Sequence, residues 1–141
     1  MKKTCRAFIV RCMHFHLWDP VDQWARENNL VGKCDLISLG GVLKDMLSSD
    51  RTVRNYLFRQ IDIAYNLHDA REGFILDHME CEAWGGIGAF KTAEQDFNFH
   101  ARILRDVSDI IKAEYPDLLL HLIVIKMEQG RAIEFVEIAP Q

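Results

Sequence analysis

The chain has 141 residues, of which 49% are apolar and 27% charged, and its formal net charge is −4 at pH 7. This length and composition are typical of one globular domain, and the acidic balance argues against nucleic acid as the main partner. The N-terminal apolar run is interrupted at Arg11 and no stretch is long enough to span a bilayer, so neither a signal peptide nor a membrane protein is indicated.

Five short apolar runs predict β-strands. In chain order they are residues 7–13, 35–39, 73–77, 119–126 and 132–138. The first four are nearly continuous in apolar residues, which is typical of parallel strands that are buried on both faces. The fifth follows a turn at residues 128–131, so it is predicted to return as an antiparallel edge strand.

Apolar residues at three- and four-residue spacing predict two long helices between these strands. One pattern runs from Val53 to Leu67 and the other from Phe97 to Tyr115. A third helix is expected to begin after Asp19-Pro20, because aspartate caps helix N-termini and proline suits the first turn. This alternation of strands and helices predicts a single α/β domain over residues 1–141, with a mainly parallel four-stranded sheet and an antiparallel edge strand.

Cysteine and histidine residues follow two of the predicted strands. Cys12 lies at the end of the first strand, and His78 and Cys81 lie just beyond the third. Open α/β sheets bind ligands outside the carboxyl ends of their strands, so these three side chains are expected to converge there. Thiolates and imidazole are ligands that zinc prefers. On the residues alone, buried apolar thiols and an ordinary polar histidine are the alternative interpretation.

Three motifs follow in order along the chain. They are Cys12-Met-His-Phe-His at the first strand, Ser38-Leu-Gly40-Gly41 after the second, and His78-Met-Glu-Cys81 after the third. In order and spacing they resemble landmarks of the β-class carbonic anhydrases, particularly the shorter bacterial and archaeal branch. The resemblance covers roughly residues 6–127. It implies a Rossmann-like three-layer fold, with helices on both faces of the sheet and a zinc ion held by Cys12, His78 and Cys81.

The chain departs from that family directly after the first cysteine. The family has Cys-x-Asp-x-Arg there, whereas this chain has His14 and His16 in place of the Asp-Arg pair. If residues 12 to 16 stay extended, His14 could be the fourth ligand of a closed zinc site. In the alternative, open site, His14 would accept a proton and protonated His16 would orient an anion, which makes both candidate catalytic residues.

The resemblance implies hydration of carbon dioxide to bicarbonate, with turnover reduced by the loss of the Asp-Arg pair. Gly40, Gly41 and Trp84 are the expected substrate pocket, because the glycines admit a ligand close to the backbone and Trp84 offers an apolar wall. A noncatalytic metal-binding or sensing module, and a hydrolase of another small electrophile, are the alternatives. The family is commonly dimeric, so a homodimer or higher homo-oligomer is expected, with residues 132–138 as the edge that pairs.

The other cysteines and histidines are assigned no function. Because no secretory signal is recognised, all four thiols are expected to be reduced or metal-bound, in the cytoplasm. The cysteines outside the zinc motif are expected to be buried or peripheral thiols, and the histidines outside it to be ordinary polar side chains. They are Cys5, Cys34, His68, His100 and His121.

Overall fold

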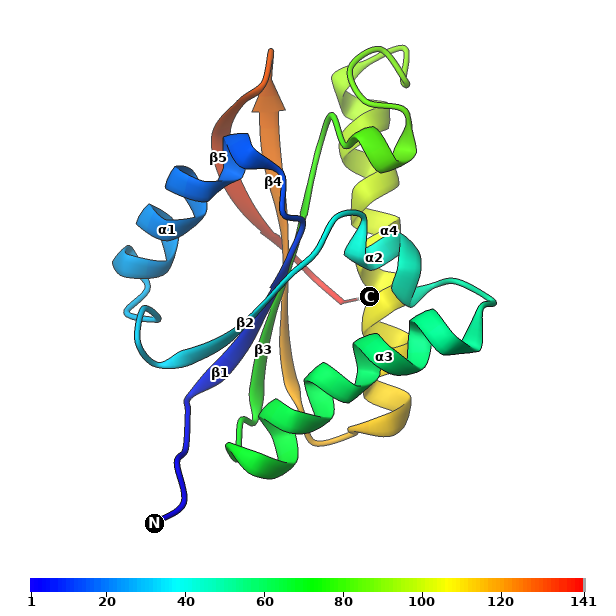
Figure 1. Cartoon of the computed structure of the whole chain (residues 1–141). Helices are drawn as coiled ribbons and strands as arrows, with labels where there is room; N and C mark the ends of the chain where they lie inside the picture. The colour runs from blue at the N-terminus through cyan, green and yellow to red at the C-terminus, as the bar shows by residue number, and fades with distance from the viewer. Residues whose placement is uncertain (141) are drawn as a thin grey trace.

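The computed structural model describes residues 1–140, and its centre is a five-stranded sheet (Figure 1). The strands are β1 (Ala7–Arg11), β2 (Cys34–Ser38), β3 (Glu72–His78), β4 (Leu119–Glu128) and β5 (Arg131–Ile138). They lie in the order β2-β1-β3-β4-β5; the first three neighbouring pairs are parallel and the β4–β5 pair is antiparallel. The predicted sheet, mainly parallel with an antiparallel edge strand, is therefore confirmed.

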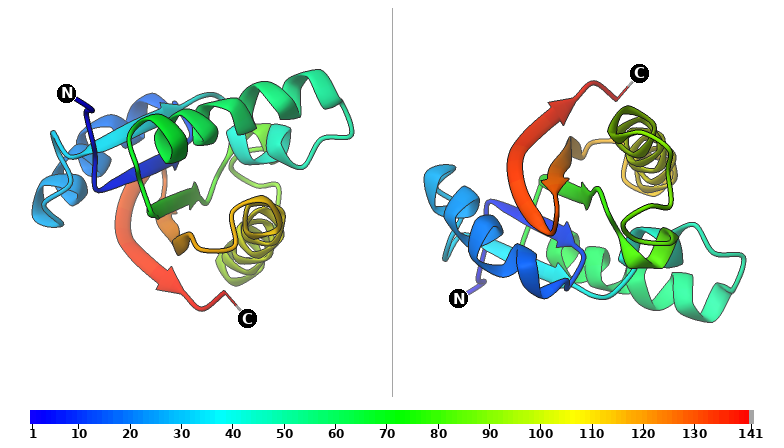
Figure 2. Two further views of the ribbon diagram at one scale, coloured as in Figure 1. Left: turned by 90° about the horizontal axis from the view of Figure 1, so that it is seen from below. Right: turned by 90° about the horizontal axis from the view of Figure 1, so that it is seen from above.

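Helices cover both faces of this sheet, as expected. The longer ones are α1 (Trp18–Glu27), α3 (Arg51–Asp62), which continues as a π-helical turn (Ile63–Leu67), and α4 (Ala93–Glu114). The short ones are α2 (Val42–Met46) and two 3₁₀ turns, Phe15–Leu17 and Glu82–Trp84. α1 lies on one face and α2, α3 and α4 lie on the other (Figure 2). This division follows from the strand order, because the connection from β1 to β2 and the crossings to β3 and β4 run in opposite directions along the sheet.

The helix starts follow capping chemistry at α4 but not at α1. At α4, the Thr92 hydroxyl accepts the backbone N–H of Gln95 at 3.1 Å. α1 begins at Trp18, and the residue before it, Leu17, makes no side-chain cap. The prediction that Asp19 caps this helix is wrong; the carboxylate lies inside the first turn, where the helix dipole favours a negative charge. Among the described residues, no helix combines the length and apolarity that a membrane crossing requires.

Close packing of β1 against β3 depends on a glycine. Phe8 in β1 is fully buried, and it pairs with Gly73 of β3. A Cβ atom at Gly73 would lie 2.5 Å from Phe8 Cζ and 2.9 Å from a methyl carbon of Leu120, closer than real side chains approach. The missing side chain therefore lets the Phe8 ring lie across β3. This strand pair carries the candidate site at its carboxyl end.

Candidate metal centre

The carboxyl ends of β1 and β3 lie where the chain reverses its direction along the sheet. From β1 the chain goes to β2 on one side, and from β3 it goes to β4 on the other. Such a switch point leaves a crevice in which α/β proteins bind ligands. Cys12 directly follows β1, His78 is the last residue of β3, and Cys81 comes three residues later. Their donor atoms all lie within 4.8 Å of one another, so the structure brings these three predicted ligands together.

His78 is oriented as a metal ligand would be. Its side chain is buried, with 1% exposed, and Nδ1 lies 2.8 Å from the carbonyl oxygen of Met79. A carbonyl can only accept a hydrogen bond, so Nδ1 carries a proton, and the neutral ring presents the lone pair of Nε2. This buried Nε2 has no hydrogen-bond partner within residues 1–140. Leaving such an atom unsatisfied costs about 1–3 kcal/mol, and a metal ion beside the two thiols would satisfy it.

The two thiols and His78 form one coupled acid–base group. The neighbouring Cys81 thiol lowers the pKa of Cys12 against the effect of burial, and His78 and the backbone amide of Gly41 act in the same direction. The pKa of Cys81 is raised, first by Cys12 and then by burial. Burial acts to lower the pKa of His78, but the adjacent Cys12 sulfur raises it overall. The group thus favours one thiolate, with the remaining protons shared among the three side chains. A divalent cation would displace these protons.

Residues 12 to 16 do not stay extended, which was the condition for His14 to reach the ion as a fourth ligand. The chain turns after Cys12 because His14 caps the 3₁₀ turn Phe15–Leu17, with its Nδ1 accepting the backbone N–H of His16 at 3.2 Å. The His14 ring lies 5.5 Å from the His78 ring, between centroids. Its nitrogens are nevertheless not part of the group of donors that lie within 4.8 Å of one another. In this conformation His14 is a neighbour of the three ligands.

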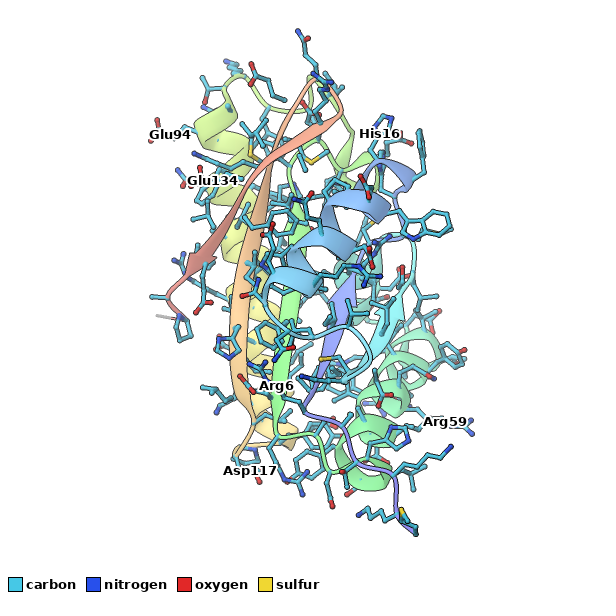
Figure 3. The ribbon with its side chains drawn as sticks, turned by 90° about the vertical axis from the view of Figure 1, so that its left-hand side faces the viewer. Arg6, His16, Arg59, Glu94, Asp117 and Glu134 are labelled. Carbon is cyan, nitrogen blue, oxygen red and sulfur yellow. The ribbon has the colours of Figure 1, made fainter. Side chains whose placement is uncertain are left out.

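His14 and His16 both line an open cavity of about 330 Å³ that also reaches His78. His16 is exposed and lies against the β4–β5 turn, where a Cβ atom on Gly130 would be 3.0 Å from its ring (Figure 3). His14 Nε2 lies 4.0 Å from a carboxylate oxygen of Glu82. The two histidines therefore form the solvent-facing wall of the candidate site.

The side expected to hold substrate is nearly filled. A Cβ atom on Gly41 would lie 3.2 Å from Ala83 Cβ, and Gly41 adopts a left-handed φ of +61° where α2 begins. Trp84 packs edge-on against Phe99 at 5.0 Å between ring centroids. Gly41 and Trp84 line a cavity of only about 10 Å³, together with both cysteines. Room of this size holds at most one water molecule.

Gly40 lies apart from both cavities. A Cβ atom at this position would be 3.4 Å from the sulfur of Met13. Gly40 is also absent from the lining of the 10 Å³ and 330 Å³ cavities. Of these two cavities, the larger lies on the side of His14 and His16.

A buried polar network lies behind His78, and the sequence pattern alone does not reveal it. His100 in α4 is fully buried, with Nδ1 2.6 Å from one Asp77 oxygen; its Nε2 lies 3.1 Å from an Asp96 oxygen but without the geometry of a hydrogen bond. The other Asp77 oxygen accepts the backbone N–H of His78 at 3.0 Å. The other Asp96 oxygen accepts the backbone N–H of Glu80, also at 3.0 Å. The segment 77–81, which carries His78 and Cys81 and is called the ligand loop below, is thereby tied to α4 at two points. The four-residue spacing of Asp96 and His100 was the available sequence signal.

Glu80 extends this network to the β4–β5 turn. Its backbone has a left-handed φ of +58°, which is uncommon for a residue with a side chain. Its carboxylate accepts the backbone N–H groups of Gln129, at 3.1 Å, and Gly130, at 2.8 Å. The ligand loop is therefore held from two sides, by α4 and by the hairpin that supports His16.

These observations define an α/β protein with a candidate metal site of two cysteines and one histidine at the switch point of its sheet. A protein-family comparison agrees with this class: the family described as "Putative carbonic anhydrase" matches residues 1–125. The chain belongs to this family.

Relatives and solved structures extend the comparison. An uncharacterised protein of Rickettsia conorii is 27% identical over 124 residues, covering 85% of this chain and 67% of that protein. An uncharacterised protein of Rickettsia bellii is 26% identical over 124 residues, covering 85% of this chain and 76% of that protein. The β-carbonic anhydrase CafD of Aspergillus fumigatus has a TM-score of 0.57 at 11% identity, covering 96% of this chain and 90% of its own. The β-carbonic anhydrase CafA of the same fungus has a TM-score of 0.56 at 10% identity, covering 99% of this chain and 77% of its own. The structural likeness confirms the expected fold, and the family match confirms the resemblance.

Proposed function

We propose that residues 1–141 act as one zinc-binding domain that hydrates carbon dioxide to bicarbonate with reduced turnover. The observation that carries the proposal is the buried Nε2 of His78, which lacks a partner in the described part of the chain and lies beside the thiols of Cys12 and Cys81. The donor set suits zinc, and the family match supports the substrate class.

Cys12, His78 and Cys81 would hold the ion and leave the fourth position toward the 330 Å³ cavity. Zinc in such a three-ligand site supplies hydroxide near neutral pH, less readily with two thiolates than with three imidazoles. The residues of the cavity wall would then bind the small anionic product.

His14 presents an N–H group to this cavity. Its Nδ1 accepts a hydrogen bond from the backbone of His16, so the neutral ring carries its proton on Nε2. The pKa of His14 is lowered by burial and by the neighbouring His78 and His16, which favours this neutral form. In this tautomer Nε2 can donate a hydrogen bond to an anion, but it can neither accept a proton nor ligate a metal ion. We therefore assign His14 and His16 to anion binding and expect slow proton transfer.

Cysteine variants test the zinc site. Replacing Cys12 or Cys81 with serine removes a thiolate ligand, so each variant should lose one zinc ion per chain relative to the wild type after dialysis. Elemental analysis measures this loss. Cys34→Ser is the matched control and should keep the wild-type zinc content, because Cys34 lies outside this group of donors. Equal zinc in the wild type and Cys81→Ser would exclude the site.

A closed, noncatalytic Cys₂His₂ site in a sensing module is the second candidate function. The 5.5 Å separation of the His14 and His78 rings favours it, because a turn of His14 away from its cap could add a fourth ligand. His14→Ala separates the two functions. The open site predicts a zinc affinity within about twofold of the wild type, whereas the closed site predicts a loss of at least about tenfold. Competition with a chromophoric chelator gives both values.

We also propose that the protein is a homodimer or higher homo-oligomer in the cytoplasm. The described chain has four free cysteines, which suit a reducing compartment. β5 is an edge strand, and its Ile133 is 58% exposed. Sedimentation at micromolar concentration should show a dimer or larger species, and Ile133→Asp should shift it toward the monomer. A monomeric wild type would contradict this part of the proposal.

A further inference from the structure

A second group of metal-ligand side chains lies at the opposite end of the sheet. Cys5 precedes β1, Asp35 lies in β2, and His68 follows the π-helical turn. Their donor atoms all lie within 4.8 Å of one another. Figure 3 shows how far this edge is from the first site: the labelled Arg6, next to Cys5, and His16 lie toward opposite ends of the molecule. The three residues lie outside the zinc motif.

The backbone fixes the three segments relative to one another. Cys5 N–H donates to the carbonyl oxygen of His68 at 2.9 Å, and Arg6 N–H donates to that of Lys33 at 2.8 Å. Asp35 is held by the parallel pairing of β1 with β2. The cluster is therefore anchored by main-chain hydrogen bonds on both sides of Cys5, which reduces the ordering cost of binding an ion.

The two distances to Asp35 Oδ2 suit a tetrahedral ion after a small adjustment. Cys5 Sγ lies 3.7 Å and His68 Nδ1 lies 2.6 Å from the same Asp35 oxygen, Oδ2. Metal–ligand bonds of zinc place sulfur and oxygen roughly 3.5 Å apart, and nitrogen and oxygen roughly 3.3 Å apart. The sulfur is thus already near its position, and the hydrogen bond between imidazole and carboxylate must open by roughly 0.7 Å. The His68 and Asp35 side chains are 31% and 33% exposed, so an ion and a water molecule can enter.

We propose that Cys5, Asp35 and His68 bind a second zinc ion, with water as the fourth ligand. A thiolate and an imidazole favour zinc over calcium or magnesium, which prefer oxygen ligands. The ion would join the segment before β1, the start of β2 and the loop before β3. Because only the folded chain brings these donors together, binding should stabilise the fold in proportion to the free zinc concentration. This site is independent of the proposed hydration activity.

The test uses the full-length Cys81→Ser variant, in which the first site is disabled. Zinc chloride is titrated against a chromophoric chelator, and the thermal midpoint is followed in parallel. We expect one zinc ion per chain with a Kd below about 1 µM, and a midpoint that rises with zinc. Adding either His68→Ala or Cys5→Ser should weaken this binding by more than about a hundredfold, since each removes a direct ligand.

The matched control is His121→Ala in the same background. His121 also pairs with a carboxylate, at 2.8 Å from Glu72, near the same edge of the sheet and without a thiol in the pair. This variant should still bind one zinc ion. The proposal is overturned if Cys81→Ser binds no zinc, or if His68→Ala and Cys5→Ser bind it as tightly as their parent. Because the first site is disabled throughout, neither result depends on whether the protein hydrates carbon dioxide.

Discussion

Zinc-loaded protein should hydrate carbon dioxide about a hundred- to ten-thousandfold more slowly than a β-class enzyme that has the Asp-Arg pair, which is the usual worth of a positioned acid–base group. The reason lies in the cavity wall. His14 Nδ1 is occupied by the His16 backbone and Nε2 carries the proton, so the ring cannot take a proton from water. His16 is exposed and lies against a turn. Stopped-flow hydration assays at several pH values measure the rate.

Two sets of variants decide whether the missing pair causes this slow rate. His14→Asp with His16→Arg restores the family residues, and aspartate can still cap the 3₁₀ turn. Hydration should rise at least about tenfold while the zinc content stays constant, and His16→Arg alone should have little effect. Unchanged hydration in the double variant would refute this explanation. Rates typical of complete enzymes in the wild type, lost in His14→Ala and His16→Ala, would instead make these histidines functional replacements.

Removing His100 should weaken zinc binding at the first site about ten- to hundredfold, although His100 is not among the ligands. His100 holds Asp77, and Asp77 holds the backbone of His78. His100→Ala leaves the Asp77 carboxylate buried without its hydrogen-bond partner in α4, which should loosen the end of β3. His100→Gln can still donate to Asp77 and should restore part of the affinity.

The measurement is chelator competition, with the thermal midpoint of the metal-free protein recorded for each variant. The midpoint separates a loss of ligand positioning from a general loss of stability. His121→Ala is the control, because its ion pair with Glu72 lies far from the ligands, and it should keep the affinity. Wild-type zinc affinity in a folded His100→Ala variant would show that the network does not position His78.

The sheet could be predicted because its signal is local. Continuous apolar runs mark strands buried on both faces, and four such runs are the parallel strands of the structure. The prediction for the first strand extended to Met13, whereas β1 ends at Arg11. Cys12 and Met13 continue the apolar pattern, but the cap formed by His14 turns the chain at this point. The spacing of apolar residues along the chain does not reveal such a cap.

The meeting of Cys12, His78 and Cys81 could also be predicted, since parallel strands of one sheet must bring their carboxyl ends to one edge. The side chains that surround these three residues could not be predicted. His100 meets Asp77 only because α4 packs over β3, a tertiary relation that the sequence spacing does not contain. The side of Gly41 and Trp84 is filled by Ala83 and Phe99, whose positions depend on the 3₁₀ turn and on α4.

X-ray absorption spectroscopy of zinc in the His68→Ala variant tests whether Cys12, His78 and Cys81 bind the ion, because that variant isolates the first site. Loaded with one equivalent, the ion should have two sulfur ligands at about 2.3 Å and two nitrogen or oxygen ligands at about 2.0 Å. This is the shell expected from Cys12, Cys81, His78 and one water molecule. A shell without sulfur, or protein that retains no zinc, would rule out zinc binding by Cys12, His78 and Cys81.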